Sequence, residues 1–487
     1  MKKVLFTHSY FYKFDSKQWR ISEPYPPLMT ITAAGLIRNE GYDVDLFDVG
    51  LRSSADEIEE VLDTYEPDYL VVFDDGFNYL TKMCLTTMRE AAFKMQQFAN
   101  ERGIKVITCS SDSTDHYEKY LIHGAHYVIR GEGEITLLEL INGLDNGVDV
   151  KNILGISYLK GDEIITTSKR PVNTQLDQLP QAAWDLVDID VYRKVWEGAN
   201  KKFHLNLATT RGCPYKCNWC AKPIYGNRYN TRDPKLVVDE IEMLVTTTGA
   251  DHFWMCDDIF GLKPGWVQEF RDELNRRNIQ IKYKIQSRAD LLLQEDNIDA
   301  LVASGLAEAW IGAESGSQVI LDAMDKGTTV DQIRESSSLL KDKGVTVALF
   351  VQFGYLGETK KDIDKTIDLV LDIMPDKIGA SVSYPLPGTK FYDKVKSDLT
   401  NKTNWSDSDD LDMMFKNTYS PAFYKKLHRY LHNRHRVKRG WLSVVDLIMR
   451  PWSMNSRRLR NVFALGLHIP LSLINRYKLN KMAVQNV

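Results

Sequence analysis

Two long stretches of the chain alternate short apolar segments with helical segments, and this alternation restricts the possible folds more than any other feature of the sequence. In residues 1–145 we expect strands at 3–6, 44–47, 69–73 and 106–109, with helices at 28–40, 55–65 and 81–101. Strands joined through helices pair in parallel. This stretch therefore predicts a doubly wound α/β sheet, whose ligands bind at the carboxyl ends of its strands. Those ends are residues 7–9, 74–77 and 110–115.

The alternation returns in residues 199–400, where six strands are expected, at 205–209, 252–256, 282–286, 309–313, 345–352 and 378–384. Six strand–helix units predict a partial (β/α)6 barrel rather than the eight units of a full barrel. Residues 146–198, between the two stretches, predict a hairpin and an extended linker. Residues 401–487 show only helical patterns, which we expect Pro451 and Pro470 to break.

The composition narrows the class of protein. Of the 487 residues 43% are hydrophobic and 26% are charged, with a formal net charge of −4, which excludes disorder as the main state. Six cysteines are too few for a disulfide framework and indicate a reduced compartment. The chain has no run of 18 apolar residues, and the apolar run after Lys3 is too short for a signal peptide. We therefore expect a cytoplasmic protein.

Three of the six cysteines, Cys213, Cys217 and Cys220, lie within eight residues in the pattern C-x3-C-x2-C. Three thiolates on one short loop can ligate three irons of a cubane and leave the fourth iron open. Structural zinc takes four protein ligands, and no fourth Cys or His lies at zinc-finger spacing. The loop therefore predicts a 4Fe-4S cluster, whereas Cys84, Cys109 and Cys256 are expected to be buried core residues.

The cysteine loop resembles the signature of the radical S-adenosylmethionine (SAM) enzymes, including an aromatic residue, Trp219, before the last cysteine. The ends of the later strands resemble other segments of that family, with Leu356 in place of a usual proline. These segments are Cys256-Asp257-Asp258-Ile259-Phe260, Gln286-Ser287-Arg288, Gly312-Ala313-Glu314-Ser315-Gly316, Met324-Asp325-Lys326-Gly327-Thr328, Phe353-Gly354-Tyr355-Leu356-Gly357-Glu358-Thr359 and Pro385-Leu386-Pro387-Gly388-Thr389. The resemblance implies that the open iron binds SAM and that reductive cleavage gives a 5′-deoxyadenosyl radical.

The same resemblance implies which side chains bind the cofactor. Asp257 and Asp258 would face the methionine ammonium group, and Arg288 would bind its carboxylate through a bidentate fork. Glu314 and Ser315 would bind the ribose hydroxyls. The alternatives are a solvated turn for the aspartates, a surface ion pair for Arg288 and a helix N-terminal acid for Glu314. The complete set of expected cofactor residues in this region is Trp219, Asp257, Asp258, Arg288, Glu314, Ser315 and Gln352.

Residues 1–145 resemble the cobalamin-binding domains attached to radical SAM barrels, through Pro26-Pro27-Leu28, Gly41-Tyr42 and Arg130-Gly131-Glu132-Gly133-Glu134. The group with this arrangement includes the anaerobic magnesium-protoporphyrin cyclase and the hopanoid methylases. It implies cobalamin contacts at Ser110, Ser111 and Gly131. The D-x-H-x-x-G motif is absent, so no histidine is expected on cobalt, and His8 and His116 are expected at the surface. Relatives commonly have paired glycines where this chain has Ser110 and Ser111, so a domain that does not bind cobalamin is the alternative.

The last part of the chain is strongly basic. Residues 425–487 contain 14 Lys and Arg residues and one acid, Asp446. The apolar segment 462–474 is too short to span a bilayer but suits a membrane interface. The alternative is that these helices pack on the acidic remainder of the chain. No recognised nucleic-acid module accompanies the charge, so nucleic acid is not an expected partner.

Three functions remain open on this basis. The first is cobalamin-dependent radical C-methylation of an unactivated carbon, and the second is a radical cyclisation or rearrangement without methyl transfer. The third is a non-catalytic, cluster-bearing regulatory or electron-transfer protein. Either enzyme would take a small-molecule or lipid-like substrate and electrons from a donor such as flavodoxin or ferredoxin. Catalytic residues beyond the cofactor sites are not identified by the sequence.

Overall fold

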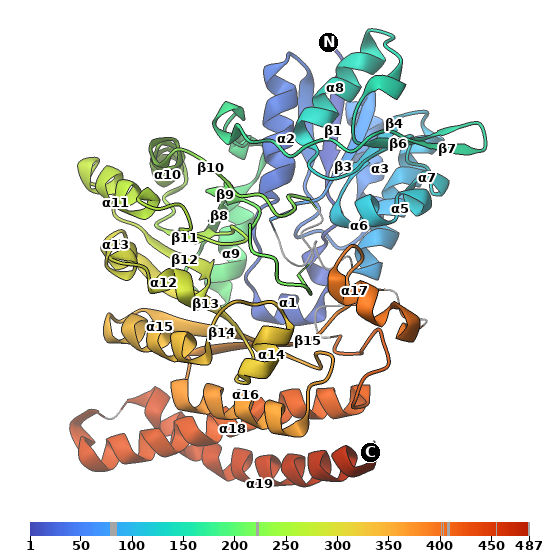
Figure 1. Ribbon diagram of the computed structural model, residues 1–487. Coiled ribbons are helices and arrows are strands. Elements are labelled where there is room, and N and C mark those ends of the chain that lie inside the picture. Colours follow the sequence, from blue (N-terminus) through green and yellow to red (C-terminus); the bar gives the residue numbers. More distant parts are fainter. Residues whose placement is uncertain are drawn as a thin grey trace. The chain divides into compact units, whose positions relative to one another are not determined.

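The computed structural model describes residues 1–77, 85–220, 224–400, 402, 404–406, 410–453 and 455–485. The helices and strands of the chain are labelled in Figure 1. The chain divides into two compact units. The first unit comprises Met1–Pro214, Ala221–Tyr283 and Thr403–Asp410, and the second comprises Tyr215–Cys220, Lys284–Lys402 and Leu411–Val487. Each unit is described by itself below.

The first unit begins with a seven-stranded sheet in the order β2-β1-β3-β4-β5-β6-β7. The first five of these strands pair in parallel, and the hairpin β6–β7 adds to β5 in the antiparallel sense. The strands are β1 Lys3–Thr7, β2 Asp43–Phe47, β3 Tyr69–Phe73, β4 Lys105–Cys109, β5 Tyr127–Ile129, β6 Ile156–Lys160 and β7 Glu163–Thr166. Every residue of β3 is buried, as expected for a central strand of a sheet covered by helices.

Helices connect these strands. Near the sheet, α2 packs with α8, and α3 packs with α5. The helices of this region are α1 Ser16–Ile21, α2 Leu28–Asn39, α3 Ile58–Tyr65, α5 Thr86–Glu101, α6 Ser111–Asp115, α7 Tyr117–Ile122 and α8 Glu134–Asp145. The expected helix 81–101 is α5, and its expected first residues, including Cys84, lie outside the described residues.

Two features of this sheet differ from the sequence expectation. Strand β5 was not expected, because three residues are too few to show a period in hydrophobicity. The hairpin β6–β7 was expected, but its pairing with β5 was not. That pairing depends on a partner strand that the pattern does not reveal.

A second sheet contains six strands in chain order, β8, β11, β12, β13, β14 and β15. In the first unit, β8 pairs in parallel with β11. The elements of this part are α9 Ile189–Gly198, β8 Leu205–Leu207, β9 Thr210–Arg211, β10 Asn230–Thr231, α10 Pro234–Thr248, β11 His252–Met255 and α11 Trp266–Arg276. The short strands β9 and β10 pair with each other in the antiparallel sense.

In the second unit, β14 pairs in parallel with β13 and with β15. The elements are β12 Lys282–Ser287, α12 Ala289–Leu292, α13 Asn297–Ala303, β13 Leu306–Glu314, α14 Gln318–Ala323, α15 Val330–Asp342, β14 Thr346–Phe353, α16 Lys360–Ile373, β15 Lys377–Val382 and α17 Lys390–Val395. The fold class is therefore the expected one, an N-terminal doubly wound sheet followed by a partial barrel of six strand–helix units.

Two long helices end the chain, α18 Pro421–Met449 and α19 Ser456–Gln485, and they pack against each other. Pro451 separates them, as expected. Pro470 lies inside α19, so the expected break at this residue is wrong. Packing of one face of α19 along α18 outweighs the roughly 3 kcal/mol that an interior proline costs. Among the described residues, no helix has the length and apolar character needed to cross a membrane.

Candidate functional site

Asp257, two residues after the end of β11, binds Thr209 and Thr210. These two residues follow β8 and lead into the cysteine loop. The Asp257 carboxylate accepts hydrogen bonds from the Thr209 amide at 2.7 Å, the Thr210 amide at 2.9 Å and the Thr209 hydroxyl at 2.5 Å. Burial raises the pKa of Asp257 to about 7, although these hydrogen bonds act in the opposite direction. Both carboxylate oxygens of Asp257 therefore already accept hydrogen bonds from the two threonines that precede the cysteine loop. Asp258, by contrast, is half-buried.

Arg211, which follows Thr210 at the start of the cysteine loop, lies between two glutamates. Its guanidinium donates to Glu132 at 2.5 Å and to Glu134 at 2.7 Å, and all three side chains are buried. Both acids belong to the Arg130–Glu134 motif of the N-terminal region. Gly212 follows at φ +79°, where a Cβ atom would lie 2.3 Å from the Arg228 carbonyl oxygen, so only glycine fits. The N-terminal sheet region and the start of the cysteine loop are thus joined by a buried ion-pair triad.

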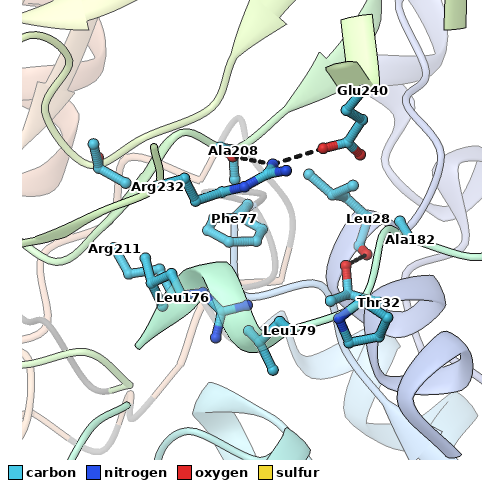
Figure 2. Close-up of a pocket in the computed structure, with 12 residues that line it drawn as sticks. Leu28, Thr32, Phe77, Leu176, Leu179, Ala182, Ala208, Arg211, Arg232 and Glu240 are labelled. Carbon is cyan, nitrogen blue, oxygen red and sulfur yellow. Dashed lines mark hydrogen bonds and ion pairs between the residues drawn. The ribbon is translucent and has the colours of Figure 1, made fainter. Parts of the chain in front are cut away.

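A small cavity lies beside Arg211 (Figure 2). Arg232 crosses its edge and donates to the Glu240 carboxylate at 2.6 Å and to the Ala208 carbonyl at 3.0 Å. The cavity holds about 40 Å³, enough for a few water molecules but far below the several hundred Å³ of a typical ligand pocket.

In the second unit, Asn218 fixes the part of the loop between Cys217 and Trp219. Its side chain donates to the Ala323 carbonyl at 2.7 Å and accepts from the Tyr355 hydroxyl at 2.7 Å. Its backbone amide donates to the Met324 carbonyl at 3.0 Å. Asn218 lies between two expected ligands but received no role from the sequence, because its partners are more than 100 residues away.

Arg288 lies beside Cys217. One guanidinium nitrogen is 3.9 Å from the Cys217 sulfur, and two others donate to the Asp290 carboxylate at 3.0 and 3.1 Å. The guanidinium also covers the ring of Tyr215 at 3.7 Å from the centroid. Burial lowers the pKa of Arg288, but Asp290 outweighs it and the net direction is upward, so this group is a permanent cation. Arg288 is therefore already engaged with a carboxylate, a ring and a thiol.

A buried ion pair forms between Glu314, at the end of β13, and Lys326 at 3.0 Å. Gly312 provides the space, because a Cβ atom there would be 2.8 Å from the Lys326 nitrogen. Glu314 has φ +57°, a conformation that costs energy for a residue with a side chain and often marks a functional position. Against burial, Glu314 and then Cys217 raise the pKa of Lys326, so a second cation lies within electrostatic range of Cys217. Lys326 belongs to the segment Met324-Asp325-Lys326-Gly327-Thr328 that resembles the family, but its role becomes visible only in the structure.

The remaining expected residues of the second unit differ in how their polar atoms are used. The Ser315 hydroxyl is buried and contacts the Thr366 hydroxyl at 3.1 Å. The Gln352 side-chain oxygen and the Trp219 indole nitrogen are buried and have no hydrogen-bond partner. Unpartnered buried polar atoms are costly, so these two fit a polar ligand that supplies the missing bonds.

The three loop cysteines are half-buried, whereas Cys109 and Cys256 are buried, as expected for core residues. Cys213 belongs to the first unit, and Cys217 and Cys220 belong to the second. Among the described residues, no group of three His, Cys, Asp or Glu side chains converges to hold a single metal ion. A cubane takes each thiolate on a different iron, and within the second unit the cations of Arg288 and Lys326 lie near Cys217, where they suit a thiolate ligand.

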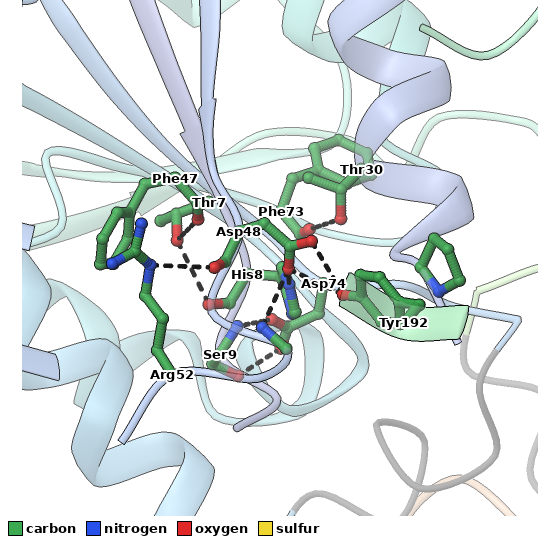
Figure 3. Close-up of polar contacts among 12 residues, drawn as sticks. Thr7, His8, Ser9, Thr30, Phe47, Asp48, Arg52, Phe73, Asp74 and Tyr192 are labelled. Carbon is green, nitrogen blue, oxygen red and sulfur yellow. Dashed lines mark hydrogen bonds and ion pairs between the residues drawn. The ribbon is translucent and has the colours of Figure 1, made fainter. Parts of the chain in front are cut away.

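The carboxyl ends of β1, β2 and β3 carry a buried polar network (Figure 3). The His8 imidazole contacts the Asp48 carboxylate at 2.9 Å, the Tyr192 hydroxyl donates to Asp48 at 2.8 Å, and Ser9 donates to Asp74. Burial opposes ionisation of Asp48, but the interactions with His8 and the hydrogen bonds from Gly50 and Tyr192 together outweigh it, so the pKa of this carboxyl lies below its ordinary value. The expectation that His8 is a surface residue is therefore wrong, because 3% of its surface is exposed.

The end of β4 and the motif 130–134 complete this edge. Ser110 caps the short helix α6, because its hydroxyl accepts from the Ser113 amide at 2.8 Å. The hydroxyl of Ser111 is buried without a partner, and the space beside Gly131 is open at φ +89°. Both features fit a polar group at this edge, although the cavity lined by Ser9, Asp74, Arg89 and Asp112 holds only about 10 Å³.

The chain matches a protein family, and the proteins similar to it include a cyclase and a methylase. Residues 207–370 match the radical SAM superfamily. The anaerobic magnesium-protoporphyrin IX monomethyl ester cyclase of Rubrivivax gelatinosus is 28% identical over 406 residues, 81% of this chain and 70% of that protein. The hopanoid C-3 methylase of Methylococcus capsulatus is 23% identical over 431 residues, 87% of this chain and 79% of that protein.

Some solved structures resemble almost the whole chain. One of them is OxsB, a cobalamin-dependent S-adenosylmethionine radical enzyme solved with aqua-cobalamin and S-adenosylmethionine bound. The TM-score is 0.72 at 16% identity, over 98% of this chain and 72% of OxsB. At this level of identity the likeness shows the fold alone.

Proposed function

We propose, from the premise that this chain is a radical SAM enzyme, that it binds a 4Fe-4S cluster through Cys213, Cys217 and Cys220 and methylates an unactivated carbon with cobalamin. The observation that carries the proposal is the C-x3-C-x2-C loop within the matched segment, with two buried cations near Cys217. When bound, the cluster and SAM supply a 5′-deoxyadenosyl radical, and cobalamin supplies a transferable methyl group.

The residues of the chain then have distinct tasks. Arg288 and Lys326 stabilise negative charge at Cys217. Because the Asp257 oxygens already accept three hydrogen bonds, Asp257 positions the loop and Asp258 is the carboxylate for the methionine ammonium group. Gln352 and Trp219 supply one acceptor and one donor to the bound cofactor, which satisfies both atoms.

We propose the carboxyl edge of the N-terminal sheet as the cobalamin site. The unpartnered Ser111 hydroxyl and the open side of Gly131 support this position, and the Ser110 hydroxyl caps α6. His8 is engaged by Asp48 through its Nε2 atom, in agreement with a cobalamin that has no histidine on cobalt.

A radical cyclisation or rearrangement is the second candidate. The relative named as a magnesium-protoporphyrin monomethyl ester cyclase favours it, because its similarity extends over 81% of this chain. The radical SAM domain argues against the third function, a non-catalytic electron carrier, since such a carrier needs no SAM site. For either enzyme we propose a small-molecule or lipid-like substrate and a one-electron donor such as flavodoxin or ferredoxin.

The cluster is tested by anaerobic reconstitution with iron and sulfide. Wild type should contain about four irons per chain and form 5′-deoxyadenosine from SAM when reduced. The variant Cys213→Ala/Cys217→Ala/Cys220→Ala should lose the cluster absorbance, whereas Cys109→Ala, a matched core cysteine, should keep it. Wild-type iron content in the triple variant would show that the ligand assignment is wrong.

Methylation is tested with SAM that carries a deuterated methyl group, and with cobalamin titrated into the full chain. Binding near one cobalamin per chain and a labelled methyl group in the product support methylation. Deoxyadenosine formation without cobalamin binding or label transfer would instead establish the cyclisation or rearrangement.

A further inference from the structure

Helix α19 exposes a row of large apolar side chains to solvent. Phe463 is 80% exposed, Leu467 61%, Ile474 48% and Tyr477 71%, and Leu471 lies between them. Successive members of this row are three or four residues apart, so they share one side of the helix. We call these five residues the outer face of α19.

The outer face lies opposite the face that packs on α18. The packing face includes His468, which contacts the Asn433 side chain at 2.9 Å, and Asn461, which donates to the Ser443 hydroxyl at 3.2 Å. Leu465 fills the space beside Gly440 of α18. Buried residues of α19 then follow at positions 468, 472, 475 and 479. The two faces are half a turn apart, so packing on α18 leaves the outer face uncovered.

Charge decides what can cover this face. Helix α19 contains six Lys and Arg residues and no Asp or Glu. Arg460 lies one turn before Phe463, and Lys478 and Lys481 lie one turn after Ile474 and Tyr477, so the apolar row has cations at both ends of the same face. A second copy of this chain would bring these cations against an equally basic face. An anionic lipid surface matches both the apolar row and the charge.

We propose that the outer face of α19 binds the surface of a membrane that contains anionic lipids, with the helix parallel to the bilayer plane. Phe463, Leu467 and Ile474 enter the interface between headgroups and acyl chains, and Arg460, Lys478 and Lys481 contact lipid phosphates. The helix lies on the membrane and does not cross it. This inference does not depend on the reaction that the enzyme performs.

The test is co-sedimentation of the full-length protein with vesicles of phosphatidylcholine alone or with about one third phosphatidylglycerol. Wild type should bind the anionic vesicles at least tenfold more strongly, and less strongly at high salt. The variant Phe463→Ser/Leu467→Ser/Ile474→Ser should lose this binding by tenfold or more. The variant Arg460→Gln/Lys478→Gln/Lys481→Gln should lose the preference for anionic lipid.

A matched control separates this face from general apolar exposure. Leu442 and Val445 are also exposed, but they lie on α18, outside the outer face of α19. Leu442→Ser/Val445→Ser should bind vesicles as wild type does, and circular dichroism should show that every variant keeps its helices. Equal binding to both kinds of vesicle, or equal losses in the α18 and α19 variants, would overturn the proposal. So would a wild-type dimer in light scattering that only the α19 apolar variant dissociates.

Discussion

The guanidinium of Arg288 shows how the setting of one residue changes the task that a sequence motif suggests. The motif implies a partner for the cofactor carboxylate, whereas in the structure Asp290 already binds two of its nitrogens and the third faces Cys217. A cation beside a cluster thiolate favours the more negative, reduced state of the cluster.

Replacing Arg288 by alanine should therefore make the midpoint potential of the reconstituted cluster more negative, because the reduced state loses a nearby cation. Arg288→Lys should retain most of the wild-type potential, and Arg334→Ala, at an exposed pair with Asp372, should leave it unchanged. Redox titration followed by electron paramagnetic resonance measures the effect. An unchanged potential with SAM binding weakened by about 1.5–3 kcal/mol would identify Arg288 as a direct cofactor partner instead.

Glu358 gives a prediction for the pH dependence of stability. Its carboxyl is buried, accepts a hydrogen bond from the Gly354 amide at 2.6 Å, and has a second oxygen without a partner. Burial raises its pKa to about 8, from an ordinary value of 4.5. Between these two values the folded chain holds a proton that the unfolded chain releases, so the free energy of unfolding contributed by this group falls as the pH rises.

Glu358 should lower the free energy of unfolding by up to about 5 kcal/mol between pH 4.5 and 8, and Glu358→Gln should remove this pH dependence. The measurement is the difference between variant and wild type in urea unfolding at several pH values, since Asp257 and Asp115 change stability in the same direction. Glu335→Gln, at an exposed residue, is the control and should follow wild type. A constant difference between Glu358→Gln and wild type across this range would contradict the assignment.

For individual residues, the sequence identified which side chains belong to the site better than it identified what those side chains contact. The spacing of Cys213, Cys217 and Cys220 is visible in the chain itself. Asp257 accepts hydrogen bonds from Thr209 and Thr210 because β8 and β11 are neighbours in the sheet. Glu314 pairs with Lys326 because Gly312 has no side chain to fill the space. Such contacts are set by tertiary packing, so the roles of Asp257, Arg288 and Glu314 could not be read from their motifs.

Among the elements, the link between the Arg130–Glu134 motif and β9 has a measurable energy. Arg211→Ala leaves Glu132 and Glu134 buried without their cation, which should destabilise the protein by about 3–5 kcal/mol at pH 8. The loss should be smaller at pH 5, because burial already raises the pKa of Glu132 and this carboxyl can take up a proton once its cation is removed.

The matched control for that prediction is Arg38→Ala. Arg38 forms a bidentate pair with Asp185, but the pair is exposed, so its loss should cost no more than about 1 kcal/mol. Urea unfolding of both variants at the two pH values gives the comparison. Similar costs for the two arginines would show that the buried triad does not hold the loop.

Several strands and helices followed their periodicity, whereas the start of β13 and the shortest elements did not. Strands β1, β3 and β4 lie within one residue of their expected bounds. Strand β5 and the pair β9–β10 have only two or three residues each, too few for a period to appear. Helix α19 continues past Pro470 because it packs against α18. A rule based on proline alone does not take that packing into account.

On the scale of the whole molecule, the order of the motifs along the chain was more informative than any single motif. Their resemblance to the group with the magnesium-protoporphyrin cyclase and the hopanoid methylases agrees with the match of residues 207–370 to the radical SAM superfamily and with the names of two similar proteins. Substrate identity is not encoded in these motifs, because they describe the cofactor side of the reaction that all members share.

Membrane binding through the outer face of α19, as proposed above, would have a kinetic consequence for the whole enzyme. A protein confined to a bilayer meets lipid-soluble molecules by diffusion in two dimensions, so its rate follows their mole fraction in the surface rather than their bulk concentration. With a total lipid extract presented in anionic vesicles, 5′-deoxyadenosine formation should slow as inert phospholipid dilutes the extract within each vesicle. Addition of the same phospholipid as separate zwitterionic vesicles should leave the rate unchanged. Phe463→Ser/Leu467→Ser/Ile474→Ser should lose this surface dilution, since the enzyme then encounters its substrates only from the aqueous phase.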